Sequence, residues 1–476
     1  METAETLTET LPQLSDEAIT TAIERLFALK HGVSAAWIDV ATTEGIVTLT
    51  GFTDNLLSLS RAEEIAKAVR GVRGVVNELE IRTPEIPDAQ LLLDLEEALA
   101  ADAATHAYAL VCHVREGEAE LRGTVRNWAE RQLALRVASG VRGIRRLTDH
   151  LLYAAPATPC PDAELTTQIR ELLRWNVRVH AGLVQVAAQD GHVQLSGIVG
   201  SAAERSEVVA TAWAAGASQV AAQELRVEPG VPWEELRQDK YDYHPDADIA
   251  QAIRATFKYD SRVVSFEPLV EVHNGVVTLR GIVSNLAARH AAGQDARNVV
   301  GVGLVHNLLK VRPVGLHEDP FIQTRVQGAL FRDPYVGRFG VAVQVHGGVV
   351  SLSGSVHTHF QQAHAGQVAA GVSGVVQVDN HLQVPTAAAL FREPTDAPPA
   401  ASGSQDQALE QAIRQELYWN AFLHGQHLRV TVKNAQATLR GTVDTWQQAQ
   451  MATHCALTVG ASTIVNKLRT RAEMPL

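Results

Sequence analysis

The feature that most constrains how this chain can fold is a short glycine-rich segment that occurs six times. In each copy, apolar and polar residues alternate on both sides of a two-residue turn, a pattern that predicts a β-hairpin. The sixth copy has Asn434-Ala435 at the turn where the others have a glycine, so its turn is expected to be less well specified. The copies are "EGIVTLTG" (44–51), "EGEAELRG" (116–123), "DGHVQLSG" (190–197), "NGVVTLRG" (274–281), "GGVVSLSG" (347–354) and "NAQATLRG" (434–441).

The segments that flank each hairpin have helical character. In "DAELTTQIRELLRWN" (162–176), Leu165, Ile169, Leu172 and Leu173 recur at helical spacing and form one apolar face. Asp or Ser near the start of such segments is expected to cap the free amides of the first helical turn. A second helical segment, a Gly-Val pair (Gly-Ala in units 3 and 6) and an apolar strand follow each hairpin. The order in every unit is therefore helix, strand, strand, helix, strand.

This order, the "VxLxG" second strand and the "GVxxVxN" closing strand resemble the BON domain, the bacterial OsmY and nodulation module. The resemblance covers all six units, although unit 2 lacks the closing Asn and unit 3 has "QVAAQE" there. It implies an α+β fold of six tandem α-β-β-α-β domains, each a three-stranded sheet with two helices on one face. Units 1 to 6 are expected at 15–83, 88–153, 162–228, 246–313, 318–385 and 404–471, with linkers at 229–245 and 386–403.

Two sets of glycines are expected at turn and helix-cap positions, where the backbone needs a positive φ angle. The alternative is a backbone-lined ion site in the Gly-Val loops, because some cytoplasmic BON proteins bind potassium and carbonyl oxygens suit such a cation. The first set ends the hairpins and comprises Gly51, Gly123, Gly197, Gly281, Gly354 and Gly441. The second set follows the second helices and comprises Gly71, Gly140, Gly216, Gly301, Gly371 and Gly460.

Charge and composition exclude several classes of protein. The 476 residues carry a formal net charge of −12, which argues against nucleic acid as a partner because both would be negative. The three cysteines form no CxxC pair and indicate neither a disulfide framework nor a zinc site. The acidic N-terminal segment does not resemble a signal peptide, and no stretch approaches the ~20 apolar residues of a membrane span. We therefore expect a cytoplasmic protein.

The sequence contains no motif typical of catalysis. P-loop, GxSxG, HExxH and paired CxxC patterns do not occur, so we expect neither enzymatic activity nor a cofactor. His357, His359 and His364 lie close together and are a weak candidate for a transition-metal site. A solvated, partly helix-capping histidine cluster is the simpler interpretation.

Unit 2 differs from the other units in its arginine content. If its loops share one edge of the domain, these arginines form a basic patch for a lipid or other polyanion, since BON proteins of the cell envelope are associated with anionic phospholipids. The favoured alternative is a solvated surface on which Glu118, Glu120 and Glu130 pair with the arginines. The candidate residues are Arg122, Arg126, Arg142, Arg145 and Arg146.

Units of about 70 residues are marginally stable alone, so we expect neighbours to bury each other's sheet faces or edges in a long object with repeated contact surfaces. The linker at 386–403 is expected to be the most mobile joint and to leave the sixth unit detachable. The leading hypothesis is a non-enzymatic scaffold that associates with itself into an oligomer or filament. The alternatives are a peripheral phospholipid-binding protein of the envelope or osmotic stress response, and cytosolic binding of a potassium-type ion. Aromatic residues at the ends of first helices are expected to plug helix–sheet cores: Trp175, Tyr259, Tyr335 and Trp419.

Overall fold

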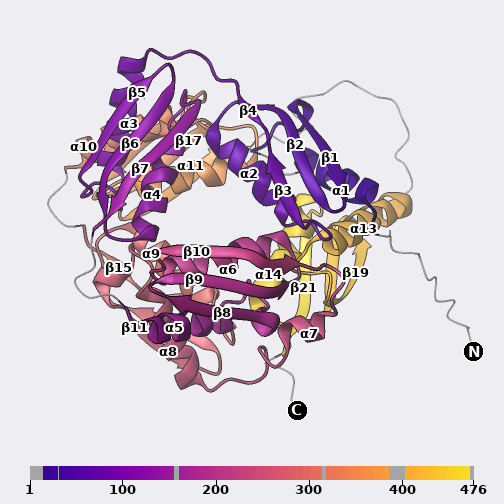
Figure 1. Ribbon diagram of the computed structural model, residues 1–476. Coiled ribbons are helices and arrows are strands. Elements are labelled where there is room, and N and C mark those ends of the chain that lie inside the picture. The colour runs from indigo at the N-terminus through magenta and orange to yellow at the C-terminus, as the bar shows by residue number, and fades with distance from the viewer. Residues whose placement is uncertain (1–13, 30–31, 155–159, 314–317, 385–401, 472–476) are drawn as a thin grey trace, which may run out of the picture.

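Six small α+β units form a ring in the computed structural model, which describes residues 14–29, 32–154, 160–313, 318–384 and 402–471. The second helices of the units surround the middle of the molecule, as Figure 1 shows. Each unit follows the predicted order of helix, hairpin, helix and strand, which confirms the fold class. Of the two linkers, most of 386–403 lies outside the described residues.

The helices and strands have equivalent places in the six units. The first helices are α1 (Asp16–Leu29), α3 (Asp88–Ala101), α5 (Asp162–Trp175), α8 (Asp246–Phe257), α10 (Asp319–Arg332) and α13 (Ser402–Trp419). The first strands are β1 (Ile38–Thr43), β5 (Leu110–Arg115), β8 (Val184–Gln189), β11 (Leu269–His273), β16 (Ala342–His346) and β19 (His427–Lys433). The second strands are β2 (Ile46–Thr53), β6 (Glu118–Val125), β9 (His192–Val199), β12 (Val276–Arg280) with β13 (Ile282–Val283), β17 (Val349–Ser355) and β20 (Gln436–Val443).

The second half of each unit contains a helix and the closing strand. The second helices are α2 (Leu56–Lys67), α4 (Trp128–Ser139), α6 (Ala202–Ala214), α9 (Leu286–Arg297), α11 (His359–Gly371) and α14 (Trp446–Thr458). The closing strands are β3 (Gly74–Asn77) with β4 (Glu80–Ile81), β7 (Arg146–Tyr153), β10 (Gln219–Val227), β14 (Leu304–Asn307) with β15 (Lys310–Val311), β18 (Gln377–Gln383) and β21 (Thr463–Thr470). A short helix, α7 (Trp233–Arg237), lies in the linker between units 3 and 4.

The second strand is central in every sheet, with the first strand antiparallel and the closing strand parallel to it. In unit 4, Val277 of β12 lies opposite Val272 of β11 and beside Val305 of β14. The first and closing strands are consequently edge strands. Among the described residues no sheet combines strands of two units. The expectation that neighbours bury each other's sheet edges is therefore wrong. The expected long object is also wrong, because the units close into a ring through their helix ends.

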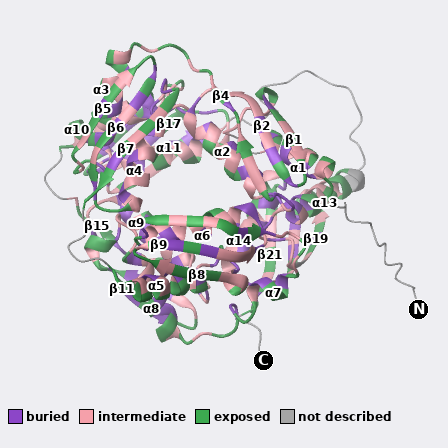
Figure 2. Cartoon of the chain, in the orientation of Figure 1, coloured by how far each residue is buried: buried purple, intermediate pink, exposed green. Residues whose placement is uncertain are grey.

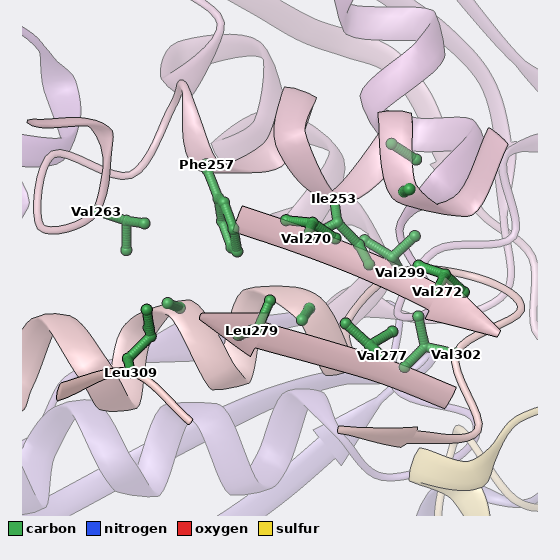
Figure 3. Packing of buried hydrophobic residues seen from close by; sticks show 14 of the residues in the cluster. Ile253, Phe257, Val263, Val270, Val272, Val277, Leu279, Val299, Val302 and Leu309 are labelled. Atoms are coloured by element: carbon green, nitrogen blue, oxygen red, sulfur yellow. The ribbon is translucent and has the colours of Figure 1, made fainter. Parts of the chain in front are cut away.

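Each unit has its own hydrophobic core between its helices and the inner face of its sheet. In unit 4, Ile253 and Phe257 of α8 lie over Val270, Val277 and Leu279 of the hairpin (Figure 3). Alternate strand residues face this core, which is the physical basis of the period-two pattern in the sequence. Figure 2 shows exposed residues at the periphery of the ring, with buried residues where helices meet sheets.

A carboxylate from the start of each first helix holds the hairpin turn. In unit 4, Asp246 accepts hydrogen bonds from the main-chain N–H of Asn274 (2.7 Å) and of Gly275 (3.0 Å). Ser15 caps α1 as expected, but the expectation that aspartates do the same is wrong, because their carboxylates bond the turns instead. The same pair of bonds occurs in all six units, from Asp16, Asp88, Asp162, Asp246, Asp319 and Asp406.

The sixth turn has the same conformation as the others despite its alanine. Asn434 and Ala435 have φ angles of 51° and 56°, close to the 50° of Asn274 in unit 4. An alanine in this left-handed region costs about 1–2 kcal/mol relative to glycine. The weaker specification predicted from the sequence therefore corresponds to backbone strain, while the turn type is unchanged.

Most of the predicted turn and cap glycines have positive φ angles. The hairpin-end glycines lie between 104° (Gly197) and 141° (Gly123). After the second helices, however, Gly140 has a φ angle of −79° and Gly371 is the last residue of α11. The positive φ angles in units 2 and 5 occur instead at Gly143 and Gly374, at 100° and 94°. The predicted positive φ angle at Gly140 and Gly371 is wrong, because Gly140 is the right-handed C-cap of α4 and Gly371 is the last residue of α11. The left-handed turn follows three residues later.

The closing asparagine ties the last strand to the second helix. In unit 4 the Nδ2 of Asn307 donates to the carbonyl of Arg289 in α9 (2.7 Å). Unit 2, which lacks this Asn, makes an ion pair between Asp149 and Arg131 instead (2.5 Å). In unit 3 the guanidinium of Arg205 bonds directly to carbonyls of the closing strand. Both departures from the sequence pattern are thus compensated by another side chain.

Candidate interaction surfaces

The units associate in pairs, 1 with 6, 2 with 5 and 3 with 4, through main-chain hydrogen bonds between helix ends. In the pair of units 1 and 6, the N–H of Arg70 donates to the carbonyl of Trp419 (2.8 Å), and Ala421 donates to Ala68 (3.0 Å). Two such bonds join unit 4 to the first helix of unit 3, from Val177 to Asn298 (2.9 Å) and from Val300 to Trp175 (2.8 Å). The sixth unit is therefore bound to the first, contrary to the expected detachable unit.

Units 2 and 5 make this contact in both directions. Ala103 donates to the carbonyl of Gly371 (2.8 Å), and Ser373 donates to Ala101 (2.9 Å). In the opposite direction Arg142 donates to Arg332 (2.8 Å). The counterpart of the bond from Ala103 is missing in this direction, because unit 5 has Pro334 at the donor position and proline has no N–H.

The length of the loop between the second helix and the closing strand determines whether that loop bonds the first helix of the partner unit. In units 3 and 6 the stretch from the helix N-cap to the amide that bonds the hairpin turn is one residue shorter, Ser201 to Ser218 and Thr445 to Ser462. In unit 1 it runs from Asn55 to Arg73. Among the described residues, only the longer loops, in units 1, 2, 4 and 5, exchange main-chain hydrogen bonds with a partner's first helix. Each short-loop unit pairs with a long-loop unit.

Aromatic residues at the ends of first helices pack into the neighbouring unit. Trp419 of unit 6 belongs to the core of unit 1 and is 8% exposed. Trp175 packs against the core of unit 4, and Tyr259 packs against the core of unit 3. Tyr335 packs in its own unit and also donates from its hydroxyl to the carbonyl of Gly32 in unit 1 (3.1 Å). The expected core plugs thus serve mainly as contacts between units.

The linker after unit 3 is part of the ring. Its Trp233 donates from Nε1 to Asp444 of unit 6 (2.9 Å), and Arg237 donates to the other carboxylate oxygen (2.9 Å). Gln426 and Arg471 also donate to Asp444, so this buried charge is fully hydrogen-bonded. The linker thereby joins units 3 and 6.

A buried polar cluster lies next to this linker. The Nζ of Lys240 donates to the carbonyls of Leu173 (2.8 Å), Asn176 (2.7 Å) and Val179 (2.5 Å) at the end of α5. Burial lowers the pKa of Lys240 to about 7, although the nearby Glu204 opposes the shift. His180, which bonds Glu204, is 0% exposed, so no substrate can reach the imidazole. The arrangement supports a structural role for the cluster.

The outer faces of the sheets remain open to solvent, and unit 4 has the clearest apolar surface there. Leu269, Ile282 and Leu308 are 64%, 48% and 53% exposed. They come from β11, from β13 and from the segment between β14 and β15, and strand alternation places all three on the outer face. We call these three residues the outer patch of unit 4. An ion pair between Arg280 and Glu271 (3.6 Å) lies on the same face.

The structure does not gather the five candidate arginines of unit 2 into one basic patch. Arg145 and Arg146 lie near the hairpin turn, where β6 begins, and Arg126 follows the opposite end of β6. Arg142 stacks over the ring of Phe331 (5.3 Å). Acidic partners lie beside the other four, namely Glu120 for Arg122 (2.8 Å), Glu130 for Arg126 (2.6 Å), Glu85 for Arg145 (3.4 Å) and Glu118 for Arg146 (3.4 Å).

The three candidate histidines of unit 5 have separate partners. His357 packs against the ring of Phe339 (4.8 Å), and His364 bonds Asp333 (2.7 Å). His359 lies 3.2 Å from the side-chain oxygen of Gln362. Within the described part of the chain, no group of three or more His, Cys, Asp or Glu residues is arranged to hold a metal ion.

The carbonyls at the hairpin turns, next to the Gly-Val loops, already accept hydrogen bonds. The carbonyl of Gly45 accepts from Arg73 (2.8 Å), and that of Gly275 accepts from Gly303 (2.8 Å). These bonds join the Gly-Val loops to the hairpin turns, and an ion site in the loops stays a prediction. Sequence reasoning missed the carboxylate that holds each turn, although its constant spacing of 28 residues before the turn was a visible signal.

Comparison with known proteins identifies the family. The family model described as BON domain matches residues 15–83, 87–155, 161–229, 245–313, 318–386 and 405–472. The chain belongs to the BON domain family. Osmotically-inducible protein Y of Escherichia coli is 31% identical over 144 residues, which cover 29% of this chain and 72% of that protein. Outer membrane lipoprotein DolP of Haemophilus influenzae is 34% identical over 110 residues, covering 22% of this chain and 56% of that protein.

A solved structure of CdsD, a structural protein of the type III secretion system of Chlamydia trachomatis, matches 48% of this BON protein and 99% of its own chain. The identity is 15% and the TM-score is 0.13, so the match carries no functional argument. None of the helices in the described ranges is long and apolar enough to cross a membrane. The cytoplasmic location stays a prediction.

Proposed function

We propose that this BON protein is a non-enzymatic scaffold that associates with further copies of itself through the outer faces of its sheets. The observation that carries the proposal is the use of helix ends for contacts within the ring, while the sheets keep unpaired edge strands. Unpaired strands and exposed apolar sheet faces are surfaces on which other chains pack.

The outer patch of unit 4 is the surface where we place the first contact between two copies. Its three apolar side chains are about half exposed or more, and burying such side chains away from water lowers the free energy. Two copies that meet through the same patch form a two-fold symmetric dimer. In such a dimer the exposed Arg280 and Glu271 can pair between copies as well as within one.

Light scattering after size-exclusion chromatography tests this proposal over a range of protein concentrations. The wild-type chain is expected to form dimers or larger species, and Leu269→Lys with Leu308→Lys is expected to be monomeric. Leu93→Lys is the matched control, because Leu93 is 56% exposed on α3 and lies outside the patch. A wild-type protein that stays monomeric at the highest attainable concentration refutes the proposal.

The relative described as an outer membrane lipoprotein favours a second candidate, contact with envelope phospholipids. Arg142, Arg145 and Arg146 are the residues on which we base it, and replacing all three with Glu is expected to weaken flotation with anionic vesicles. Glu85 and Glu118 beside Arg145 and Arg146 reduce the net positive charge and weigh against this candidate. Vesicle binding that the triple variant retains eliminates it.

A further inference from the structure

A cavity of about 360 Å³ lies where units 2, 3 and 4 meet. In the contact between units 3 and 4, the loop of unit 4 bonds the end of the first helix of unit 3. The cavity lies at the reciprocal position, where the short loop of unit 3 makes no main-chain hydrogen bond to the end of the first helix of unit 4. Tyr259, Asp260 and Ser261 follow α8 in unit 4, at the positions that Trp175, Asn176 and Val177 occupy at the end of α5 in unit 3. Asp260 accepts a hydrogen bond from the N–H two residues later (2.8 Å), as Asn176 does (2.9 Å). Of these two helix ends, only that of unit 3 exchanges main-chain hydrogen bonds with a loop of the other unit among the described residues.

Two polar side chains that line the cavity, Asp295 and Ser261, have buried oxygen atoms. The side chain of Asp295 also forms a hydrogen bond with that of Asp260, so the two carboxyl groups lie side by side. Burial and the neighbouring Asp260 raise the pKa of Asp295 well above its ordinary value, although Arg262 opposes the shift. Because two adjacent carboxylates repel each other, a cationic ligand beside Asp295 stabilises its ionised form.

Arg136 of α4 contributes a positive charge to the same cavity. Desolvation and the neighbouring Arg262 lower the pKa of Arg136. Arg262 is already bonded to Asp260 by three contacts of 2.5 to 3.1 Å, so these two charges satisfy each other. Glu207, which also lines the cavity, accepts a hydrogen bond from Asn176 (2.9 Å). Arg136 and the protonated carboxyl of Asp295 are left, each beside a group of its own sign.

Aromatic side chains complete the walls. Trp128 comes from unit 2, Trp175 from unit 3 and Tyr259 from unit 4. The faces of such rings attract ammonium groups and also pack against the apolar body of a small molecule. The volume falls in the range typical of small-molecule sites, about 300–1,000 Å³.

We propose that this cavity binds a small organic zwitterion, with its ammonium group at Asp295 and its carboxylate at Arg136. The ammonium group takes the place of the proton that Asp295 otherwise holds, so binding releases that proton to the buffer. The bound molecule would complete the contact between units 3 and 4 and tie unit 2 to both.

Isothermal titration of the full chain tests the proposal with glycine, 3-aminopropionate and 4-aminobutyrate, which carry the two charges at increasing separation. At least one is expected to bind, with proton release measured from the heats in buffers of different ionisation enthalpy. Asp295→Asn and Arg136→Gln are each expected to weaken binding at least about tenfold, the loss of one charged hydrogen bond. Propylamine and propionate, which carry one charge each, are expected not to bind.

Arg146→Gln is the matched control, because this exposed arginine of the same unit lies outside the cavity. Ser261→Ala tests the site a second time if Asp295→Asn does not fold. Three results overturn the proposal: no zwitterion binds, binding persists in both Asp295→Asn and Arg136→Gln, or propionate binds as tightly as the zwitterions. Light scattering of the same samples keeps this result separate from self-association.

Discussion

Replacing Trp419 with alanine should open the ring between units 1 and 6. Trp419 is 8% exposed and belongs to the hydrophobic core of unit 1, although it is part of unit 6. Removing a buried Trp side chain from a core costs about 3–5 kcal/mol, and we take the lower value because an interface can partly collapse. At about 1.4 kcal/mol for each factor of ten, the open state becomes about a hundredfold more populated.

Hydrogen exchange measured by mass spectrometry checks this prediction. Segments that contain Arg70 and Ala421, whose amides bond across the interface, are expected to exchange about a hundredfold faster. Leu417→Ala is the control, since Leu417 lies in the core of unit 6 itself and its loss should accelerate exchange in β19, β20 and β21. Unchanged exchange at Arg70 and Ala421 in Trp419→Ala, with the unit 6 sheet accelerated instead, refutes the reasoning.

Further predictions concern strain and charge. Ala435→Gly should stabilise unit 6 by about 1 kcal/mol in thermal unfolding, because glycine adopts the positive φ angle of 56° without strain. Gly197→Ala should destabilise the protein more than Gly281→Ala, since a Cβ at Gly197 would lie 2.0 Å from the carbonyl oxygen of Leu183 and one at Gly281 meets nothing closer than 3.7 Å. Equal losses would mean that φ strain dominates. Stability should rise between pH 7 and about 10, because folding lowers the pKa of Lys240 from 10.5 to about 7 and the unfolded chain therefore binds more protons in that window. A shift of this size corresponds to about 4–5 kcal/mol, and Lys240→Met should remove the pH dependence in chemical denaturation.

The sequence predicted the unit itself well because the unit is stabilised by local patterns. Period-two alternation gives Val277 and Leu279 to the core of unit 4, and helical spacing does the same for Ile253. Asp246 was predicted to cap its own helix but bonds the hairpin turn 28 residues later. An aspartate at the start of a helical segment is compatible with either role, so the sequence alone does not distinguish them. The glycine error in units 2 and 5 has a similar origin: Gly140 and Gly143 are both plausible helix ends.

The candidate sites were much less predictable. Arg122 and Arg126 of unit 2 stand out in the sequence, but the structure separates them from Arg145 along the strand and places an acidic residue beside each. No sequence motif links Asp295 to Arg136, because they lie in different units and each is ordinary within its own helix. Their relation is a product of the ring and has no local signature.

The sequence by itself determined six similar folds, the positions of their hairpins and the membership of the BON family, because each depends on residues within about 70 positions of one another. Only the tertiary structure decided that unit 1 closes onto unit 6, since main-chain hydrogen bonds between helix ends do not depend on particular side chains. The one-residue difference between the long and short loops was present in the sequence throughout. Its meaning depends on which helix end lies opposite, and folding alone supplies that information.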